Sequence, residues 1–260
     1  MEIAFEWQPE LPPGHPPPQL LLLLHGAGGR GVDMVPLAEA LHDAFPQAAI
    51  VVPDAPHRAD GASDDRRQWF GIPSLDDAAR IERVAQALPP LADWVRATQR
   101  RTGAAAAATA IVGFSQGAIL ALELAARHDG LCGRVLAFAG RYASLPVAPP
   151  RETTLHLFHG DDDAVIPVAH ARETLQHLGA VGGDATLDVA AGVGHALHPA
   201  LIEQALFRLR NHIPYRTWQA ALGAAPPRAE SPLPHAAREA ASGDGDGDGD
   251  GDGDGGVDRC

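Results

Sequence analysis

The chain has 260 residues and a formal net charge of −13 at pH 7, and 45 % of its residues are hydrophobic. This length and composition are typical of a globular protein with one large domain or two small ones. The negative charge comes without any basic stripe, which argues against nucleic acid as a partner. All 20 basic residues are Arg, and the absence of Lys excludes Schiff-base and P-loop mechanisms.

Neither a membrane span nor a secretory signal is expected. The longest aliphatic run, Leu20–Leu24, is far shorter than the roughly 20 residues that cross a bilayer. The N-terminus lacks the basic and apolar regions of a signal peptide, which predicts a cytoplasmic location. Cys132 lies mid-chain and Cys260 ends the chain, so we expect no structural disulfide, in agreement with a reducing compartment.

The chain begins with a proline-rich segment, residues 1–18, which we expect to be irregular. Short apolar runs then predict strands at 19–24, 48–52, 108–114, 134–138, 154–158 and 186–189. Helical patterns lie between and after them, at 32–44, 76–101, 117–128, 168–178 and 199–211. This alternation predicts an α/β fold, a mainly parallel sheet with helices on both faces, in a domain at 19–221. The helix at 76–101 contains Pro89-Pro90, where we expect a break or a kink.

Residues 222–260 are rich in Ala, Pro, Gly and Asp and predict a disordered acidic tail. Within it, Gly243–Gly256 alternates Gly and Asp, as the opening of a calcium-binding EF-hand loop does. The closing Glu and the flanking helices of that loop are absent. We therefore interpret the run as a solvated acidic tail rather than a calcium site.

The strongest chemical signal is Gly113-Phe114-Ser115-Gln116-Gly117, between a predicted strand and a predicted helix. This setting is that of a nucleophile elbow, in which a tight turn exposes a serine hydroxyl and glycines are needed to avoid clashes across the turn. The alternative is an ordinary glycine-rich turn, since the five-residue pattern also occurs by chance. The strand and helix that flank it favour a nucleophilic Ser115.

A serine needs a base and an acid, and the α/β-hydrolase order places both further along the chain, each after its own strand. The strand at 154–158 is followed by Asp161, Asp162 and Asp163, among which spacing cannot choose. The strand at 186–189 is followed by His195, which lies just after Gly194. His195 and His198 also have a metal-like spacing, but no third ligand is near in sequence, so we expect no metal site.

A glycine-rich loop, 25–31, follows the first buried strand. Such a loop can direct backbone N–H groups at an oxyanion, with the amide of Gln116 as a second donor. The loop also matches the Gly-x-Gly-x-x-Gly fingerprint of dinucleotide-binding proteins, with Asp54 as the acidic partner. Asp54 is further from the glycines than that fingerprint requires, and dinucleotide binding would leave Ser115 and His195 unexplained.

These motifs occur together and in order: 25–28, 113–117, His159-Gly160-Asp161-Asp162-Asp163-Ala164-Val165-Ile166-Pro167 and Gly194-His195. Together they resemble the phospholipase/carboxylesterase family of α/β-hydrolases, which includes acyl-protein thioesterases. The segments 67–70 and 140–146 are most similar to bacterial YpfH-type esterases. The resemblance covers roughly residues 20–213 and leaves the tail outside.

The resemblance implies roles that spacing leaves open. It assigns the triad aspartate to Asp163, the oxyanion-hole amides to Ala27 and Gln116, and acyl-pocket contacts to Trp69 and Phe70. For the last two, packing in the core is the alternative. No cofactor is implied.

We expect a serine carboxylesterase that cleaves short to medium acyl esters through an acyl-enzyme on Ser115, with His195 as base and Asp163 as its partner. Its substrate would be a small-molecule acyl ester or thioester. An acyl thioesterase or lysophospholipase with the same triad is an alternative. Alternatives of a different class are a non-catalytic hydrolase-fold binding protein and an NAD(P)-binding protein. The sequence does not predict the oligomeric state.

Overall fold

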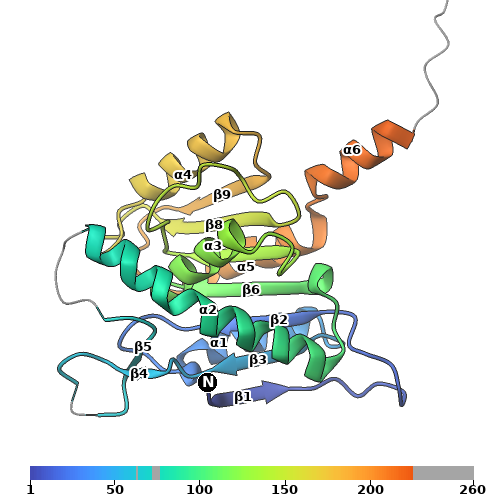
Figure 1. Ribbon diagram of the computed structural model, residues 1–260, viewed down its shortest axis with the longest axis horizontal. Coiled ribbons are helices and arrows are strands. Elements are labelled where there is room, and N and C mark those ends of the chain that lie inside the picture. The colour runs from blue at the N-terminus through green and yellow to red at the C-terminus, as the bar shows by residue number, and fades with distance from the viewer. Residues whose placement is uncertain (63, 72–76, 225–260) are drawn as a thin grey trace, which may run out of the picture. The chain divides into compact units, whose positions relative to one another are not determined.

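The computed structural model describes residues 1–62, 64–71 and 77–224 (Figure 1). Within them the main sheet has seven strands in the order β1-β3-β2-β6-β7-β8-β9. β1 pairs antiparallel with β3, and every other neighbouring pair in this sheet is parallel. The strands are β1 (Ile3–Trp7), β2 (Leu20–Leu24), β3 (Ala49–Pro53), β6 (Thr109–Phe114), β7 (Arg134–Phe138), β8 (Thr154–Gly160) and β9 (Ala185–Ala190). A separate two-stranded ribbon pairs β4 (His57–Arg58) with β5 (Arg67–Gln68).

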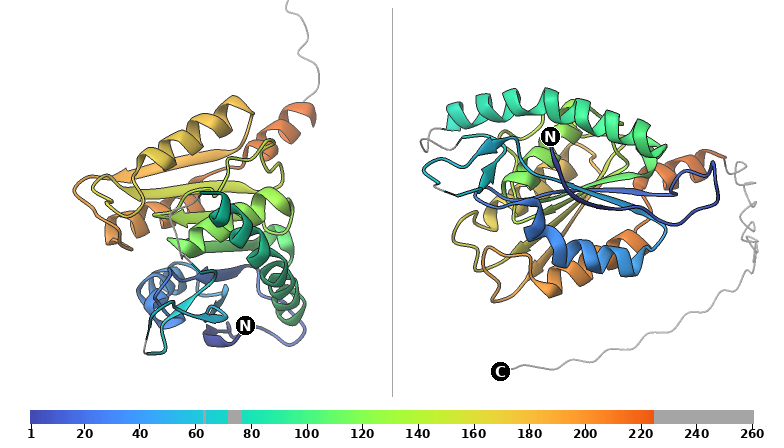
Figure 2. Two further views of the ribbon diagram at one scale, coloured as in Figure 1. Left: turned by 60° about the vertical axis from the view of Figure 1, so that its left-hand side comes forward. Right: turned by 90° about the horizontal axis from the view of Figure 1, so that it is seen from below.

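Helices cover both faces of the sheet, as predicted. Figure 2 shows α2 on the opposite side of the sheet from α1 and α5. The α-helices are α1 (Val35–Ala44), α2 (Asp77–Thr102), α3 (Gln116–Arg127), α4 (Ala169–Ala180), α5 (Pro199–Asn211) and α6 (Tyr215–Ala224), and the short 3-10 helices are η1 (Gly31–Met34) and η2 (Ala106–Ala108). The prediction of a mainly parallel sheet between helices is confirmed.

β2 illustrates why the central strands are continuous apolar runs. Successive side chains of a strand point to opposite faces. Leu20, Leu22 and Leu24 accordingly pack in the core beneath α2 and α3, whereas Leu21 and Leu23 pack in the core beneath α1 and α5. Because both faces are covered, all five leucines are buried, and no polar position interrupts the run.

The prediction that residues 1–18 are irregular is wrong for the first part of the segment. Ile3, Phe5 and Trp7 belong to β1, the edge strand that pairs with β3. Each of its residues is exposed or only partly buried, so this strand lacks the continuous apolar run of its neighbours. The proline-rich part that follows contains no helix or strand.

We expected a break or a kink at Pro89-Pro90, and the helix does not break there: α2 continues through both prolines. Each proline removes one backbone donor from the helix. Both are exposed, while Leu88 and Leu91 are buried against the sheet on the opposite side. We attribute the continuity of the helix to this tertiary packing, which supplies most of the stability of helices in proteins.

The C-terminal part of the described chain contains α6, a helix that we did not predict. Asp184 accepts a hydrogen bond from the backbone N–H of Tyr215 at 3.0 Å, and Arg216 donates to the hydroxyl of Thr154 at 3.0 Å. Because α6 continues to Ala224, it crosses the boundary that we expected between residues 221 and 222. The Gly/Asp run at 243–256 lies outside the described residues, and the division of the chain into domains stays a prediction.

No helix in the described part of the chain combines the length and the apolar character that crossing a membrane requires.

Candidate active site

The turn that carries Ser115 is sharp and strained. β6 ends at Phe114, α3 begins at Gln116, and Ser115 between them has φ 52° and ψ −114°. This backbone conformation is costly for any residue with a Cβ and persists only where the surroundings enforce it. A Cβ at Gly113 would collide with the backbone of Gly117, and a Cβ at Gly117 would collide with the carbonyl of Leu24. Both glycines are therefore required by the close packing of strand and helix.

The structure brings the three predicted triad side chains together at the carboxyl ends of β6, β8 and β9. His195 Nε2 lies 2.9 Å from the Ser115 hydroxyl, and His195 Nδ1 lies 2.7 Å from Asp163 Oδ2. The Asp163 side chain is fully buried and the His195 side chain is 16 % exposed. The carboxylate is thus shielded from water, while the imidazole is accessible to substrate.

Asp163 is held by a set of donors that favours its charged form. Its Oδ1 accepts the backbone N–H groups of Val165 and Ile166, both at 2.9 Å, and its Oδ2 faces His195. Burial alone raises the pKa of a carboxyl, but the hydrogen bonds from His195, Ile166 and Val165 outweigh it and lower the pKa of Asp163 below its ordinary value. Asp163 is therefore a carboxylate that can orient the imidazole and stabilise its cation.

The other two aspartates of this loop, unlike Asp163, lie at the surface. Asp161 and Asp162 are exposed. Asp161 Oδ1 accepts the backbone N–H of Gly192 at 2.7 Å, which ties this loop to the loop that carries His195. Of the three aspartates that spacing left open, Asp163 is the one whose carboxylate contacts the imidazole.

His159 is a buried neighbour of this carboxylate that the sequence analysis left without a role. Its Nε2 donates to the carbonyl of Ile166 at 2.7 Å and lies 3.3 Å from Asp163 Oδ2. Burial lowers the pKa of His159 below the ordinary histidine value. A neutral His159 with its N–H directed at the carbonyl fixes the backbone whose amides hold Asp163.

The glycine-rich loop is anchored through the side chain of its first residue, His25. His25 Nδ1 donates to the carbonyl of Gly26 at 2.7 Å, and His25 Nε2 accepts the backbone N–H of Ala55 at 3.0 Å. Since an N–H donor faces Nε2, the ring is neutral with its proton on Nδ1, and burial lowers its pKa accordingly. Gly28 N–H donates to the Arg67 carbonyl at 2.8 Å, so the loop is fixed from both sides.

Gln116 has a structural role that the sequence analysis missed. Its backbone N–H is at the first position of α3, where no intrahelical acceptor exists. Its side-chain Oε1 accepts the N–H of Trp69 and its Nε2 donates to the carbonyl of Phe70, both at 2.7 Å. Trp69 Nε1 in turn donates to the carbonyl of His25 at 2.8 Å. The side chain of the residue after Ser115 therefore ties α3 to the Trp69-Phe70 segment.

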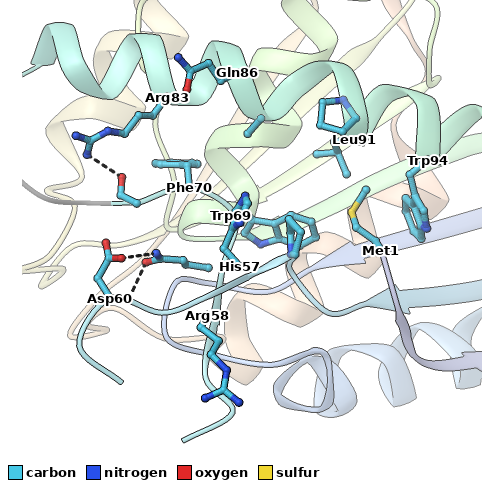
Figure 3. A pocket seen from close by; sticks show the side chains of 15 residues that line it. Met1, His57, Arg58, Asp60, Trp69, Phe70, Arg83, Gln86, Leu91 and Trp94 are labelled. Carbon is cyan, nitrogen blue, oxygen red and sulfur yellow. Dashed lines mark hydrogen bonds between the residues drawn. The ribbon is translucent and has the colours of Figure 1, made fainter. Parts of the chain in front are cut away.

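Ser115 lies at the wall of a cavity of about 410 Å³ that is also lined by Ala27, Gln116 and Phe70. Trp69 is not among the described residues that line this cavity. Of the two residues predicted to contact the acyl group, Phe70 lines the cavity of Ser115 and Trp69 does not. Trp69 lines a neighbouring cavity of about 820 Å³, which Figure 3 shows below α2. Phe70 borders both cavities.

Four further side chains in the cavity of Ser115 could not be assigned from the sequence. Arg80 and Arg83 reach it from α2, Arg141 from the segment after β7, and His170 from α4. Their positions are far apart along the chain, and only the fold shows that they share a cavity. Arg141 lies in one of the segments that carried the family resemblance, but nothing in the pattern gave it a role.

Asp54 and His198, the residues considered for dinucleotide binding and for a metal site, both have structural hydrogen bonds. Asp54 accepts the backbone N–H of Gly31 at 2.7 Å and lies 3.6 Å from the Arg30 guanidinium, so it stabilises the glycine-rich loop. His198 accepts the backbone N–H of Ala200 at 3.3 Å and caps α5. In the part of the chain that the structure describes, no group of three or more His, Cys, Asp or Glu side chains is placed to hold a metal ion.

A mainly parallel sheet with Ser115, Asp163 and His195 after its strands, in this order along the chain, defines an α/β-hydrolase. Residues 11–213 match the model of the Phospholipase/Carboxylesterase family. The chain belongs to this family, as its motifs led us to expect.

Individual relatives are consistent with this assignment. The chain is 40 % identical to Esterase YpfH of Escherichia coli over 215 residues, which are 83 % of this chain and 92 % of that protein. The crystal structure of esterase PE8 superimposes with a TM-score of 0.70 at 30 % identity, over 81 % of this chain and 99 % of that one. The Bacillus cereus carboxylesterase, with a TM-score of 0.63 at 18 % identity over 78 % and 91 %, shares the fold. The chain is a hydrolase of the esterase class.

Proposed function

We propose that the chain hydrolyses carboxylic esters through an acyl-enzyme intermediate on Ser115. The observation that carries this proposal is the unbroken chain of hydrogen bonds from the Ser115 hydroxyl through His195 to the buried Asp163, which begins at the wall of a cavity. A serine hydroxyl becomes a nucleophile when an adjacent base takes its proton, and an oriented histidine is such a base.

In the proposed mechanism His195 Nε2 removes the proton of Ser115 as the hydroxyl attacks the acyl carbonyl. Asp163 holds the proton of Nδ1 and stabilises the imidazolium that forms. His195 then gives its proton to the leaving alcohol, whose bond to the acyl carbon breaks. Water, deprotonated by His195, attacks the acyl-enzyme in the same way, and the acid leaves as Ser115 regains its proton.

The negative charge on the carbonyl oxygen requires donors in both steps. We assign them to the backbone N–H groups of Ala27 and Gln116, because these two residues line the same cavity as Ser115. Gln116 is also at the N-terminus of α3, where the helix dipole favours negative charge. The hydrogen bonds that fix the glycine-rich loop, to which Ala27 belongs, support this assignment.

We propose substrates with short to medium acyl chains, because a cavity of about 410 Å³ is near the small end of the range for ligand pockets, roughly 300–1,000 Å³. Thioesters and lysophospholipids are alternatives that the same triad could cleave. A cytoplasmic location is in keeping with the free thiol of the buried Cys132.

A fluorophosphonate probe tests the mechanism directly. The native protein is expected to take up one label, on Ser115, and to lose esterase activity as the label accumulates. Ser115→Ala should take up none, whereas Ser144→Ala, at an exposed serine, should be labelled like the native protein. Equal labelling of the native protein and Ser115→Ala would refute the proposal. A panel of oxygen and sulfur esters of increasing acyl length then separates the alternatives.

A further inference from the structure

The cavity at Ser115 is lined by an unusual density of positive charge. Arg80, Arg83 and Arg141 line it together with His170, and none of the lining residues that the structure describes is acidic. The chain as a whole carries a net charge of −13. Three guanidinium side chains thus line the cavity beside Ser115, in a chain whose formal net charge is negative.

Two of these arginines come from one face of α2. Arg80 and Arg83 are three positions apart, and residues at this spacing are neighbours on a helix surface. Arg83 donates from Nη1 to the carbonyl of Gly71 at 3.1 Å (Figure 3). It borders both cavities. Both side chains are partly buried. A guanidinium has five N–H donors, and within the described residues Arg83 uses Nη1 for the bond to Gly71, which leaves further donors for a ligand.

The third arginine lies on a segment that the fold holds in place. Glu123 on α3 is buried, and its Oε1 accepts the backbone N–H groups of Ala143 and Ser144 at 2.8 and 3.2 Å. Arg141 itself directs Nη1 at His170 Nε2, 3.5 Å away. Burial of a carboxylate is costly unless it is hydrogen-bonded, so these two bonds hold the backbone at Ala143 and Ser144, which follow Arg141 in the same segment.

We propose that the natural substrate is an ester that carries an anionic group, a carboxylate or a phosphate, and that Arg83 and Arg141 bind this group, with Arg80 adding to the positive potential. This inference rests on the proposed esterase activity and names its substrate class. Guanidinium groups bind carboxylate and phosphate through paired hydrogen bonds, and such bonds are stronger in a partly dehydrated cavity than at an open surface. The same charges offset the repulsion between an anion and a protein of net negative charge.

Matched ester pairs test this inference. In the first pair, para-nitrophenyl pentanoate is compared with mono-para-nitrophenyl glutarate, which has a carboxylate in place of the terminal methyl group of the acyl chain. In the second, phenyl butyrate is compared with para-carboxyphenyl butyrate, which places the charge on the leaving group. In the third, 2-hydroxyethyl butyrate is compared with its phosphate monoester. The pair with the largest ratio shows which side of the ester and which anion the arginines bind.

We expect kcat/KM for the anionic member of at least one pair to exceed that of its neutral partner by about tenfold, as charged hydrogen bonds commonly contribute. Arg83→Gln and Arg141→Gln should each lower this ratio by about tenfold, and added salt should lower it in the native protein. Arg172→Gln removes the same charge from the exposed side of α4, outside the lining of the cavity, and should leave the ratio unchanged.

The outcomes separate the two proposals. Hydrolysis of the neutral esters at rates equal to or above those of every anionic partner would overturn this inference and leave the esterase proposal intact. An unchanged ratio in both arginine variants would likewise overturn it. Failure to hydrolyse any ester of the panel, together with failure to react with the fluorophosphonate probe, would overturn both.

Discussion

Gln116 Oε1 accepts the backbone N–H of Trp69 at 2.7 Å, across 47 positions of the chain. The residue that follows Ser115 thus supports, through its side chain, the segment whose Arg67 and Trp69 hydrogen-bond to the glycine-rich loop. Trp69 is in turn hydrogen-bonded to the glycine-rich loop, because its indole N–H donates to the carbonyl of His25. Both proposed oxyanion donors depend on this connection, since it joins the start of α3 to the loop that carries Ala27.

Gln116→Ala should therefore lower both stability and activity. The substitution leaves the buried N–H of Trp69 and the carbonyl of Phe70 without partners, which costs about 1–3 kcal/mol for each unsatisfied group. We expect a lower free energy of unfolding in urea and a fall of at least tenfold in kcat, because the loop is no longer held against the oxyanion. Gln176→Ala, at an exposed position of α4, is the matched control. A Gln116→Ala protein with native stability and native kcat would contradict this role.

The strained turn at Ser115 predicts a difference between two inactive variants. Ser115→Ala and Ser115→Gly both lack the nucleophile, and kcat should fall by several orders of magnitude in each. At φ 52° and ψ −114° a glycine is unstrained, whereas alanine keeps the cost of its Cβ. We expect Ser115→Gly to be more stable than Ser115→Ala by about 1 kcal/mol, measured by urea denaturation. Equal stability would show that the surroundings do not strain this turn.

Much of the fold could be predicted because its elements are locally encoded. The parallel strands are continuous apolar runs, and α5 begins at Pro199 and ends at Asn211 as its pattern indicates. β1 was not predicted because an edge strand has no fully buried face and therefore no continuous apolar run. The continuity of α2 through Pro89-Pro90 could not be predicted, because the local cost of two prolines is visible in the sequence, whereas the packing of Leu88 and Leu91 is not.

Some residues of the candidate site could also be predicted from local sequence patterns, and others could not. Ser115 is marked by its own neighbours, since the glycines beside it are demanded by the turn. The choice of Asp163 over Asp161 depends on which carboxylate faces inward, which spacing does not encode and the family resemblance supplied. The shared cavity of Arg83 and Arg141 depends on how α2 approaches the segment after β7, and no local pattern predicts it.

Stability should depend on pH through a buried histidine distant from the triad. His156 accepts a hydrogen bond from Arg134 on Nε2 and contacts Thr186 through Nδ1, and burial with the nearby Arg134 charge lowers its pKa to about 3. In the unfolded chain an ordinary histidine takes up a proton below about pH 6.5. The contribution of neutral His156 is thus fully present above about pH 6.5 and is lost progressively as the pH falls toward 3.

His156→Gln removes this protonation step. Urea denaturation between pH 7 and 4 should show a steeper loss of stability with falling pH in the native protein than in His156→Gln. The difference in slope corresponds to one proton bound by the unfolded chain, about 1.4 kcal/mol per pH unit. The comparison uses slopes, so any loss of stability that the variant shows at pH 7 does not affect it. Parallel curves would show that folded His156 takes up a proton as readily as the unfolded chain.

The three aspartates of the loop after β8 allow the role of one carboxylate to be isolated. Asp163→Asn preserves the size of the side chain but replaces the acceptor that holds the proton on His195 Nδ1, which favours the wrong tautomer and leaves the imidazolium uncompensated. We expect kcat to fall by about 10⁴, the size of the effect in a serine protease triad. Asp162→Asn removes the same charge at an exposed position and should retain native kcat.

Asp161→Ala should give an intermediate loss of kcat, since it releases the Gly192 backbone N–H and with it the loop that carries His195. Initial rates on one neutral ester rank the three variants, and a loss in Asp162→Asn equal to that in Asp163→Asn would mean that the overall charge of the loop, rather than the contact with His195, supports the reaction.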